Sequence, residues 1–184
     1  MPFGILMFAT TLAAAALTLI FGSHETSDFW VDALQLWWTS VRPRLSHVKR
    51  LVIYLDNGPK NSGSRTQFLK RMVQFADWSG LEIRLVYYPP YHSKYNRVER
   101  CWSALERKWN GTLLTCWEVV RERAQRMTWK GQHPTLSRLE GHYANGVIVP
   151  KAEMRTYAAR LERSATLPKY DITIKPQTST PQVN

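Results

Sequence analysis

Apolar residues follow two spacings along the chain, and together these predict an alternation of strands and helices. Short continuous apolar runs are typical of buried strands, and apolar residues that recur every three or four positions are typical of helices that face a core. The predicted strands are residues 3–8, 17–21, 51–55 and 82–88, and the predicted helices are residues 27–42, 65–79, 94–109, 116–127 and 151–163. Strands that alternate with helices indicate an α/β sheet with parallel neighbours.

The first 22 residues contain no charged side chain, so a membrane span or a signal peptide is one interpretation of this segment. However, no basic residue precedes the apolar stretch, and Thr10, Thr11 and Thr18 interrupt it. Two short apolar runs instead favour a pair of buried strands, or a core helix, over a membrane segment. We therefore expect the segment to belong to the domain core, without membrane association.

Two acidic residues, Asp56 and Glu99, each follow a predicted strand. Asp56 comes directly after the apolar run 51–55 and precedes a sharp turn. Glu99 lies in the first turns of the predicted helix 94–109, on the flank of an apolar stripe that would face the core. That stripe consists of Val98, Trp102, Leu105 and Trp109. For Glu99 alone an ordinary solvated helix acid is the better interpretation, but two carboxylates brought together in this way suit metal-assisted chemistry on phosphates.

The balance of charge favours a polyanionic partner. Lysine and arginine total 25 and aspartate and glutamate total 14, which gives a formal net charge of +11. Such an excess is typical of proteins that bind nucleic acid, although a solvated basic surface is the alternative. Cys101 and Cys116 form neither a disulfide framework nor a zinc-binding spacing, so we expect a reducing, cytoplasmic compartment.

At these residues the sequence resembles the DDE-type transposases of bacterial insertion sequences, in the group related to mariner transposases. The resemblance runs from about residue 4 to residue 174. Its segments are Leu55-Asp56-Asn57-Gly58, residues 88–102, residues 109–112 and residues 127–131. Within residues 88–102 the matching residues are Tyr88-Pro89-Pro90-Tyr91-His92-Ser93 and Asn96-x-x-Glu99-Arg100-x-Trp102. The resemblance implies an α/β, ribonuclease-H-like fold in which helices flank a mixed sheet. It also implies DNA cleavage and strand joining with two Mg²⁺ ions, at transposon ends and in target DNA. Asp56 matches the second aspartate and Glu99 the final glutamate of the Asp-Asp-Glu site.

Other residues near the two carboxylates have weaker assignments. The supporting candidates are Asn57, Asn96 and His92, and the candidates for neutralising DNA phosphates are Lys94, Arg97 and Arg100. Helix capping explains Asn96 at least as well, and loop packing explains His92 equally well. Any one of the basic residues is explained as well by solvated surface charge.

The first aspartate of the family has no match in this sequence. Asp28 and Asp32 are the only aspartates before Asp56, and both lie on the predicted helix that follows the first two strands, so neither is assigned as a metal ligand. The resemblance therefore predicts an N-terminally truncated catalytic domain over residues 1–163 that lacks its first strand. Residues 164–184 are expected to form an extension with little order after about residue 175.

This interpretation predicts how the chain behaves alone. Mg²⁺ binding is weakened, strand joining is absent, and the sheet edges left by the missing strand favour self-association. The expected location is the cytoplasm of a bacterium, in association with the nucleoid. Two alternatives stay open: a metal-dependent nuclease of the same fold, and a DNA-binding remnant without catalysis.

Overall fold

The computed structural model describes residues 4–9, 17–89 and 96–177. Its elements in chain order are β1 (Gly4–Ala9), β2 (Leu17–Gly22), α1 (Ser27–Val41), the short 3₁₀ helix η1 (Arg42–Arg44), β3 (Arg50–Leu55), α2 (Thr66–Ser79), β4 (Glu82–Tyr87), α3 (Arg97–Trp109), α4 (Trp117–Gln125), β5 (Thr135–Arg138), α5 (Lys151–Ala158), β6 (Leu161–Arg163) and β7 (Asp171–Ile174). The chain is therefore a mixed α/β protein, as the apolar spacing predicted.

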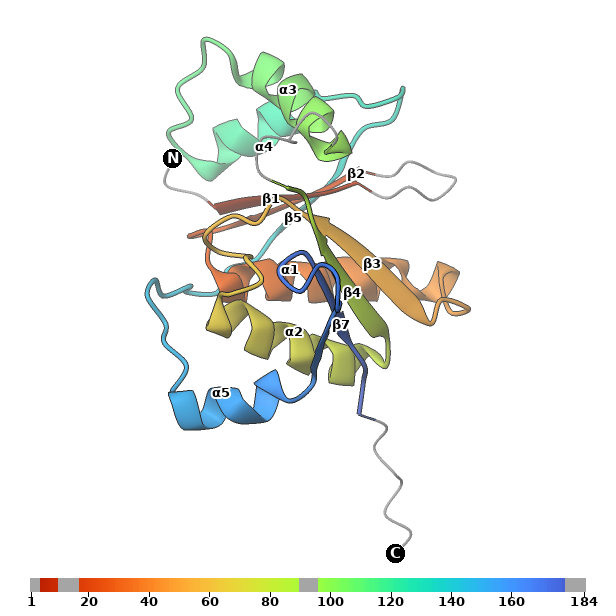
Figure 1. Cartoon of the computed structure of the whole chain (residues 1–184). Helices are drawn as coiled ribbons and strands as arrows, with labels where there is room; N and C mark the ends of the chain where they lie inside the picture. The colour runs from red at the N-terminus through yellow and green to blue at the C-terminus, as the bar shows by residue number, and fades with distance from the viewer. Residues whose placement is uncertain (1–3, 10–16, 90–95, 178–184) are drawn as a thin grey trace, which may run out of the picture.

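The strands form two mixed sheets rather than one (Figure 1). The first has the order β1-β2-β5, with β1 and β2 antiparallel and β5 parallel to β2. The second has the order β3-β4-β7-β6, in which only the pair β3–β4 is parallel. Among the described strands, β1 and β3 each pair with one neighbour, so each leaves an unpaired edge. The N-terminal hairpin and β3 therefore belong to different sheets.

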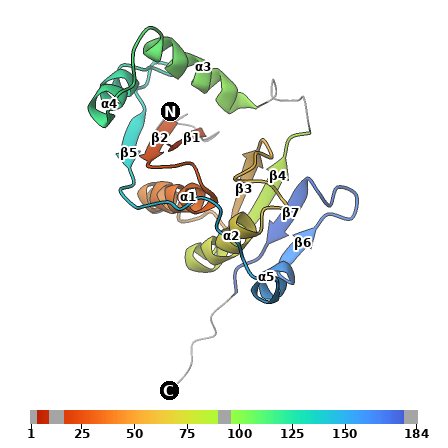
Figure 2. The same cartoon turned by 90° about the vertical axis from the view of Figure 1, so that its left-hand side faces the viewer.

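Helices α1 and α2 pack against each other and cover one side of both sheets. Helix α1 contacts β1 and β2, whereas α2 contacts β4 and β7. In Figure 2 the two helices lie together below the two sheets. Their shared core contains fully buried side chains from both helices and from both sheets, such as Ile20, Phe29, Phe68, Phe75 and Leu85. The helix pair therefore connects two sheets that are not hydrogen-bonded to each other.

Helices α3 and α4 build a second core on the opposite face of the hairpin. Cys101 and Leu105 from α3 and Val120 from α4 pack with Leu19 and Phe21 from β2. Because β2 has a core on each face, all six of its residues are buried. The predicted apolar stripe of α3 is confirmed, since its four residues all belong to or pack against this second core.

Two helix boundaries differ from the sequence prediction. Helix α5 ends at Ala158, and residues 161–163, which were predicted to continue it, form β6 and pair with β7. The prediction was wrong there because these residues pair with β7, a strand further along the chain that no local pattern reveals. Helix α3 begins at Arg97, after the cap at Asn96. Strand β7 lies between β4 and β6, so residues up to Ile174 contribute to the second sheet.

Candidate active site

Asp56 lies at the C-terminal end of β3, in a loop that fixes its carboxylate. The backbone N–H of Gly58 donates to Asp56 Oδ1 at 3.2 Å, and Asn61 Nδ2 donates to the same oxygen at 3.0 Å. Among the described residues no donor bonds Asp56 Oδ2. One carboxylate oxygen is therefore held by the protein, and the other is left for a different partner.

Asn57 also stabilises the conformation of this loop. Its backbone φ is 62°, in the left-handed region that asparagine tolerates better than most residues. Its side-chain oxygen accepts a hydrogen bond from the backbone N–H of Gly63 at 3.4 Å. The structure gives the Asn57 side chain a backbone partner rather than a contact with Asp56. The supporting role predicted for Asn57 therefore stays a prediction, and it would act through the conformation of the loop.

Asn61 is the polar residue most closely tied to Asp56. Only 7% of Asn61 is exposed, and its backbone carbonyl accepts a hydrogen bond from the Tyr87 hydroxyl at 3.1 Å. Burial raises the pKa of that tyrosine, so its hydroxyl keeps its proton and stays a donor. The side-chain oxygen of Asn61, in contrast, is buried and accepts no hydrogen bond from the part of the chain that the structure describes. An orphaned oxygen beside a fixed carboxylate is rare in a folded protein and calls for an explanation.

Glu25 is a carboxylate near Asp56 that the sequence did not reveal. It lies between β2 and α1, and burial and the charge of Asp56 raise its pKa, while Lys60 lowers it. The start of α1 is joined to the Asp56 loop, because Ser27 Oγ donates to the carbonyl oxygen of Lys60 at 2.7 Å. An acid in a connecting segment belongs to no repeating pattern of apolar residues. Its position near Asp56 is therefore visible only in the folded structure.

Glu99 occupies the first turn of α3 and is exposed. Asn96 caps this helix, and its side-chain oxygen accepts a hydrogen bond from the backbone N–H of Val98 at 3.3 Å. The capping interpretation of Asn96 is therefore confirmed. An acid at this position is also favoured by the helix dipole. In Figures 1 and 2 the first turn of α3 lies beyond the C-terminal ends of β3 and β4, and Asp56 is the residue that follows β3. The shared cleft for Asp56 and Glu99 stays a prediction.

The remaining predicted residues are placed as follows. His92 and Lys94 lie outside the described residues. Arg97 is the first residue of α3, and Arg100 is exposed one turn further along. A basic side chain at Arg100 is thus available to a phosphate.

Asp28 and Asp32 are held in a separate polar cluster on α1 and α2. Gln67 Nε2 donates to Asp28 at 2.8 Å, the Tyr143 hydroxyl donates to Asp32 at 3.1 Å, and Arg71 pairs with both carboxylates. These contacts explain both aspartates as links between the helices and residues 139–147. Leaving them out of the metal site is consistent with this placement.

A divalent cation fits the Asp56 loop in chemical terms. The part of the chain that the structure describes contains no group of three or more His, Cys, Asp or Glu side chains able to hold a metal. Amide oxygens also serve as ligands for Mg²⁺ and Ca²⁺, however, and Asn61 offers one that has no other partner. The loop therefore supplies hard oxygen donors of the kind that these ions prefer.

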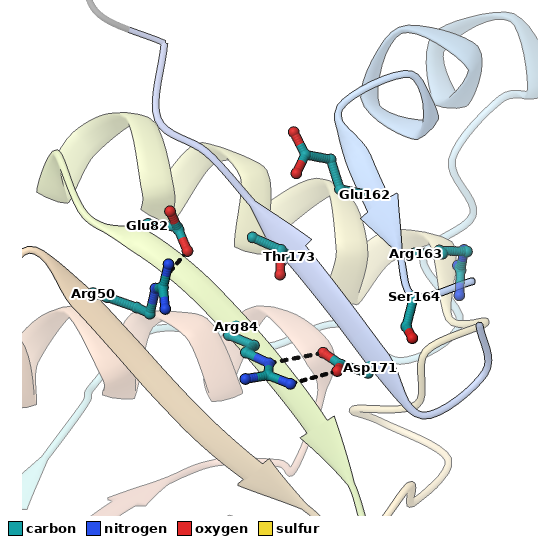
Figure 3. Close-up of a pocket in the computed structure, with 8 residues that line it drawn as sticks. All are labelled: Arg50, Glu82, Arg84, Glu162, Arg163, Ser164, Asp171 and Thr173. Atoms are coloured by element: carbon teal, nitrogen blue, oxygen red, sulfur yellow. Dashed lines mark hydrogen bonds and ion pairs between the residues drawn. The ribbon is translucent and has the colours of Figure 1, made fainter. Parts of the chain in front are cut away.

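A pocket among the described residues lies elsewhere, on the outer face of the second sheet. It has a volume of about 340 Å³, and its lining includes two ion pairs, Arg50–Glu82 and Arg84–Asp171, each at 2.6 Å (Figure 3). None of the predicted site residues lines it. Because its charges are paired with each other across neighbouring strands, it stabilises the sheet and is not the candidate active site.

Comparison with known proteins gives one match, to a family model. No described helix is long and apolar enough to cross a membrane. No curated protein and no solved structure matches the chain. A family model described as the Rhodopirellula transposase DDE domain matches residues 1–176. The match spans nearly the whole sequence and includes both Asp56 and Glu99, and the chain therefore belongs to this family of DDE transposase domains.

Proposed function

We propose that the chain is a ribonuclease-H-like catalytic domain that acts in DNA transposition, with Asp56 and Glu99 as ligands of its two Mg²⁺ ions. The observation that carries the proposal is the Asp56 loop, where the protein fixes one carboxylate oxygen and leaves the other without a donor among the described residues. Bound Mg²⁺ supplies activation of the attacking oxygen and neutralisation of the leaving oxygen. The mariner-related grouping rests on the sequence resemblance alone.

Some residues of the chain would position the metal ligands, and others would neutralise the charge of DNA. The loop holds Asp56 in one orientation through the hydrogen bonds from Gly58 and Asn61, so little reorganisation is needed when a ligand arrives. Glu99 approaches from the start of α3, and Arg100 on the same turn is suited to a DNA phosphate. Cleavage by water and joining by the freed 3′-hydroxyl would both take place between these elements.

The proposed fold places a further strand between β1 and β3. Both strands have an unpaired edge, and both belong to the layer that α1 and α2 cover. Residues at the β3 edge are only partly covered: Val52 is 39% exposed and Tyr54 is 60% exposed. A strand in this position would bring the first aspartate of the family next to Asp56. We propose that without it the chain binds Mg²⁺ weakly, does not join strands and associates with other copies through these edges.

The test is an assay of plasmid nicking and DNA end joining in Mg²⁺ with the wild-type chain, Asp56→Ala and Glu99→Ala. We expect salt-sensitive DNA binding by all three proteins and no joined product. Nicking by the wild type that both substitutions abolish would identify a metal-dependent nuclease. Joining by the wild type that Asp56→Ala abolishes would show that another carboxylate completes the site. Nicking or joining that is indifferent to both substitutions would contradict the assignment of Asp56 and Glu99.

A second candidate, a DNA-binding domain without catalysis, is favoured by one observation. The described residues contain no cluster of three metal-binding side chains, whereas basic residues exceed acidic residues by 11 in the whole chain. Mg²⁺-dependent nicking by the wild type in the same assay would exclude this role.

A further inference from the structure

Three oxygen atoms of the Asp56 loop converge beside Gly58. A Cβ built on Gly58 would lie 3.4 Å from Asn61 Oδ1, 3.4 Å from Asp56 Oδ1 and 3.5 Å from Asp56 Oδ2. The glycine therefore leaves a space the size of a methyl group, with oxygen atoms around it. No hydrogen atom points into this space from Asn61 Oδ1, which is an acceptor only.

The orphaned oxygen of Asn61 marks this space as a ligand site. Only 7% of Asn61 is exposed, and its Nδ2 bond to Asp56 Oδ1 fixes which end of the amide carries the oxygen. An amide oxygen buried without a partner costs free energy that a bound cation would recover. The oxygen thus lies next to a carboxylate, where a cation is also favoured by charge.

Glu25 provides a second negative charge from a different element. The hydrogen bond from Ser27 Oγ to the carbonyl oxygen of Lys60 holds the start of α1 against the residue that precedes Asn61. Glu25 lies two residues before this anchor, and the Lys60 ammonium is directed to Asn145 Oδ1 at 3.5 Å. The segment that carries Glu25 is therefore anchored to the loop that carries Asp56 and Asn61.

We propose that Asn61 Oδ1 and the Glu25 carboxylate join Asp56 as ligands of a single divalent cation. This inference rests on the proposed function in using Asp56, but it adds two ligands and requires neither Glu99 nor DNA. Mg²⁺ usually keeps several waters and takes few protein oxygens, so three ligands from the protein suffice for one ion. The Asp56 loop and Glu25 would then hold one cation by themselves.

The experiment is a titration of the full chain with Mn²⁺, followed by the electron paramagnetic resonance signal of the free ion. We expect one bound Mn²⁺ per chain in the wild type. Glu25→Gln is expected to weaken the affinity by at least about tenfold, the lower end of the effect of substitutions around metal sites. Glu106→Gln, an exposed acid on α3, is the matched control and is expected to bind as the wild type does.

Gly58→Ala tests the space itself. The added methyl group meets its neighbours at ordinary contact distances, so the fold tolerates it, but it would occupy the space between the three oxygens. We expect Mn²⁺ binding to be lost while the thermal midpoint changes little. Gly141→Ala is the matched control. Its added methyl group would also lie 3.4 Å from side-chain atoms, but these atoms belong to Tyr143, which is far from Asp56 in sequence.

Asn61→Asp separates a ligand from a positioning residue. The substitution keeps an oxygen but removes the N–H that bonds Asp56, so a positioning role predicts weaker Mn²⁺ binding and a ligand role predicts binding at least as tight as in the wild type. The ligand role also predicts a larger rise of the thermal midpoint on addition of Mn²⁺ than in the wild type.

Three results would overturn the inference: no Mn²⁺ bound by the wild type, Glu25→Gln or Gly58→Ala binding as the wild type does, or loss of binding in Asn61→Asp. The proposed function would survive each of them if DNA cleavage or joining still required Asp56 and Glu99. Conversely, normal Mn²⁺ titrations in a chain that neither cleaves nor binds DNA would sustain the cation site and contradict the proposed function.

Discussion

The loop of Asp56 and the first turn of α3 present two carboxylates in contrasting ways. Asp56 is held by two hydrogen bonds to one oxygen, in a loop that Asn57, Asn61 and the start of α1 all fasten. Glu99 is exposed, and its backbone belongs to a helix start that Asn96 caps. The first carboxylate is thus oriented by the fold alone. The second is positioned only as well as its helix is, which leaves its final orientation to a bound ion or to DNA.

The largest expected effect concerns whether the two carboxylates share one site. Fe²⁺ bound in place of Mg²⁺ reduces added hydrogen peroxide to a hydroxyl radical and hydroxide and becomes Fe³⁺, and the radical cuts the backbone next to the ion. We expect cuts near residues 56–61 in the wild type, and cuts near Glu99 only when DNA is added. Asp56→Ala is expected to abolish both sets, because the oriented carboxylate holds the ion to which Glu99 is recruited. The fragments are measured by mass spectrometry.

Excess Mg²⁺ is the control for this cleavage, since it competes for the same oxygens and should suppress the cuts. Cuts near Glu99 that persist in Asp56→Ala would mean that the two acids bind separate ions. Asp56 and Glu99 would then belong to two separate metal sites rather than to one shared site.

A smaller effect is expected from removing the hydrogen bond by which Ser27 anchors the start of α1 to the Asp56 loop. Ser27→Ala removes the hydrogen bond to the Lys60 carbonyl, and a buried hydrogen bond of this kind contributes about 1 kcal/mol to the free energy of unfolding. We also expect weaker Mn²⁺ binding, because the segment with Glu25 is no longer anchored to the Asp56 loop. Denaturant unfolding and Mn²⁺ titration measure the two effects.

Ser40→Ala is the matched control on the same helix. Its hydroxyl donates to the carbonyl oxygen of Trp37 over the same distance, 2.7 Å, but stays within α1. A change in Mn²⁺ affinity as large as that of Ser27→Ala would show that α1 stability, and not the anchor, controls the ion.

The elements that set up this comparison were predictable from the sequence to different degrees. Asp56 was found because a strand and a sharp turn are local patterns, and α3 was found because its apolar stripe repeats at helical spacing. Glu25 was missed because its approach to Asp56 depends on the contact between Ser27 and Lys60, which are 33 residues apart. Local patterns report the period of a segment, whereas such contacts depend on how the segments pack.

The C-terminal strands show the same limit in the fold. Residues 161–163 were predicted as the end of a helix, because the charged sequence from Lys151 onward has no break that marks a strand. Pairing with β7, which itself joins β4, decides their conformation instead. Strand pairing between distant segments has no signature in the spacing of either segment alone.

A modest effect is expected from Arg100, on the exposed side of the site. Each phosphate contact contributes about −0.9 to the slope of the logarithm of the DNA binding constant against the logarithm of salt concentration. Arg100→Gln should therefore reduce the slope by about 0.9 if this side chain reaches DNA. Arg155→Gln, an exposed arginine on α5, is the control and should leave the slope unchanged. Equal changes in both variants would point to general charge rather than to contact at the start of α3.

The smallest effect concerns the negative charges on the fastened side in the absence of metal. Burial and the Asp56 charge raise the pKa of Glu25 above its ordinary value of 4.5, so the folded chain binds a proton there more tightly than the unfolded chain does. Stability from this group is full below pH 4.5 and is lost as the pH rises through the raised pKa. Glu25→Gln removes that loss, so with a chelator present we expect its thermal midpoint to exceed the wild type's at pH 7 and to equal it at pH 4. Added Mn²⁺ should reverse the order at pH 7, because the wild type then gains a ligand that the variant lacks. A midpoint difference that is the same at both pH values would show that Glu25 and Asp56 do not interact, and the fastened side would then consist of Asp56 and its loop alone.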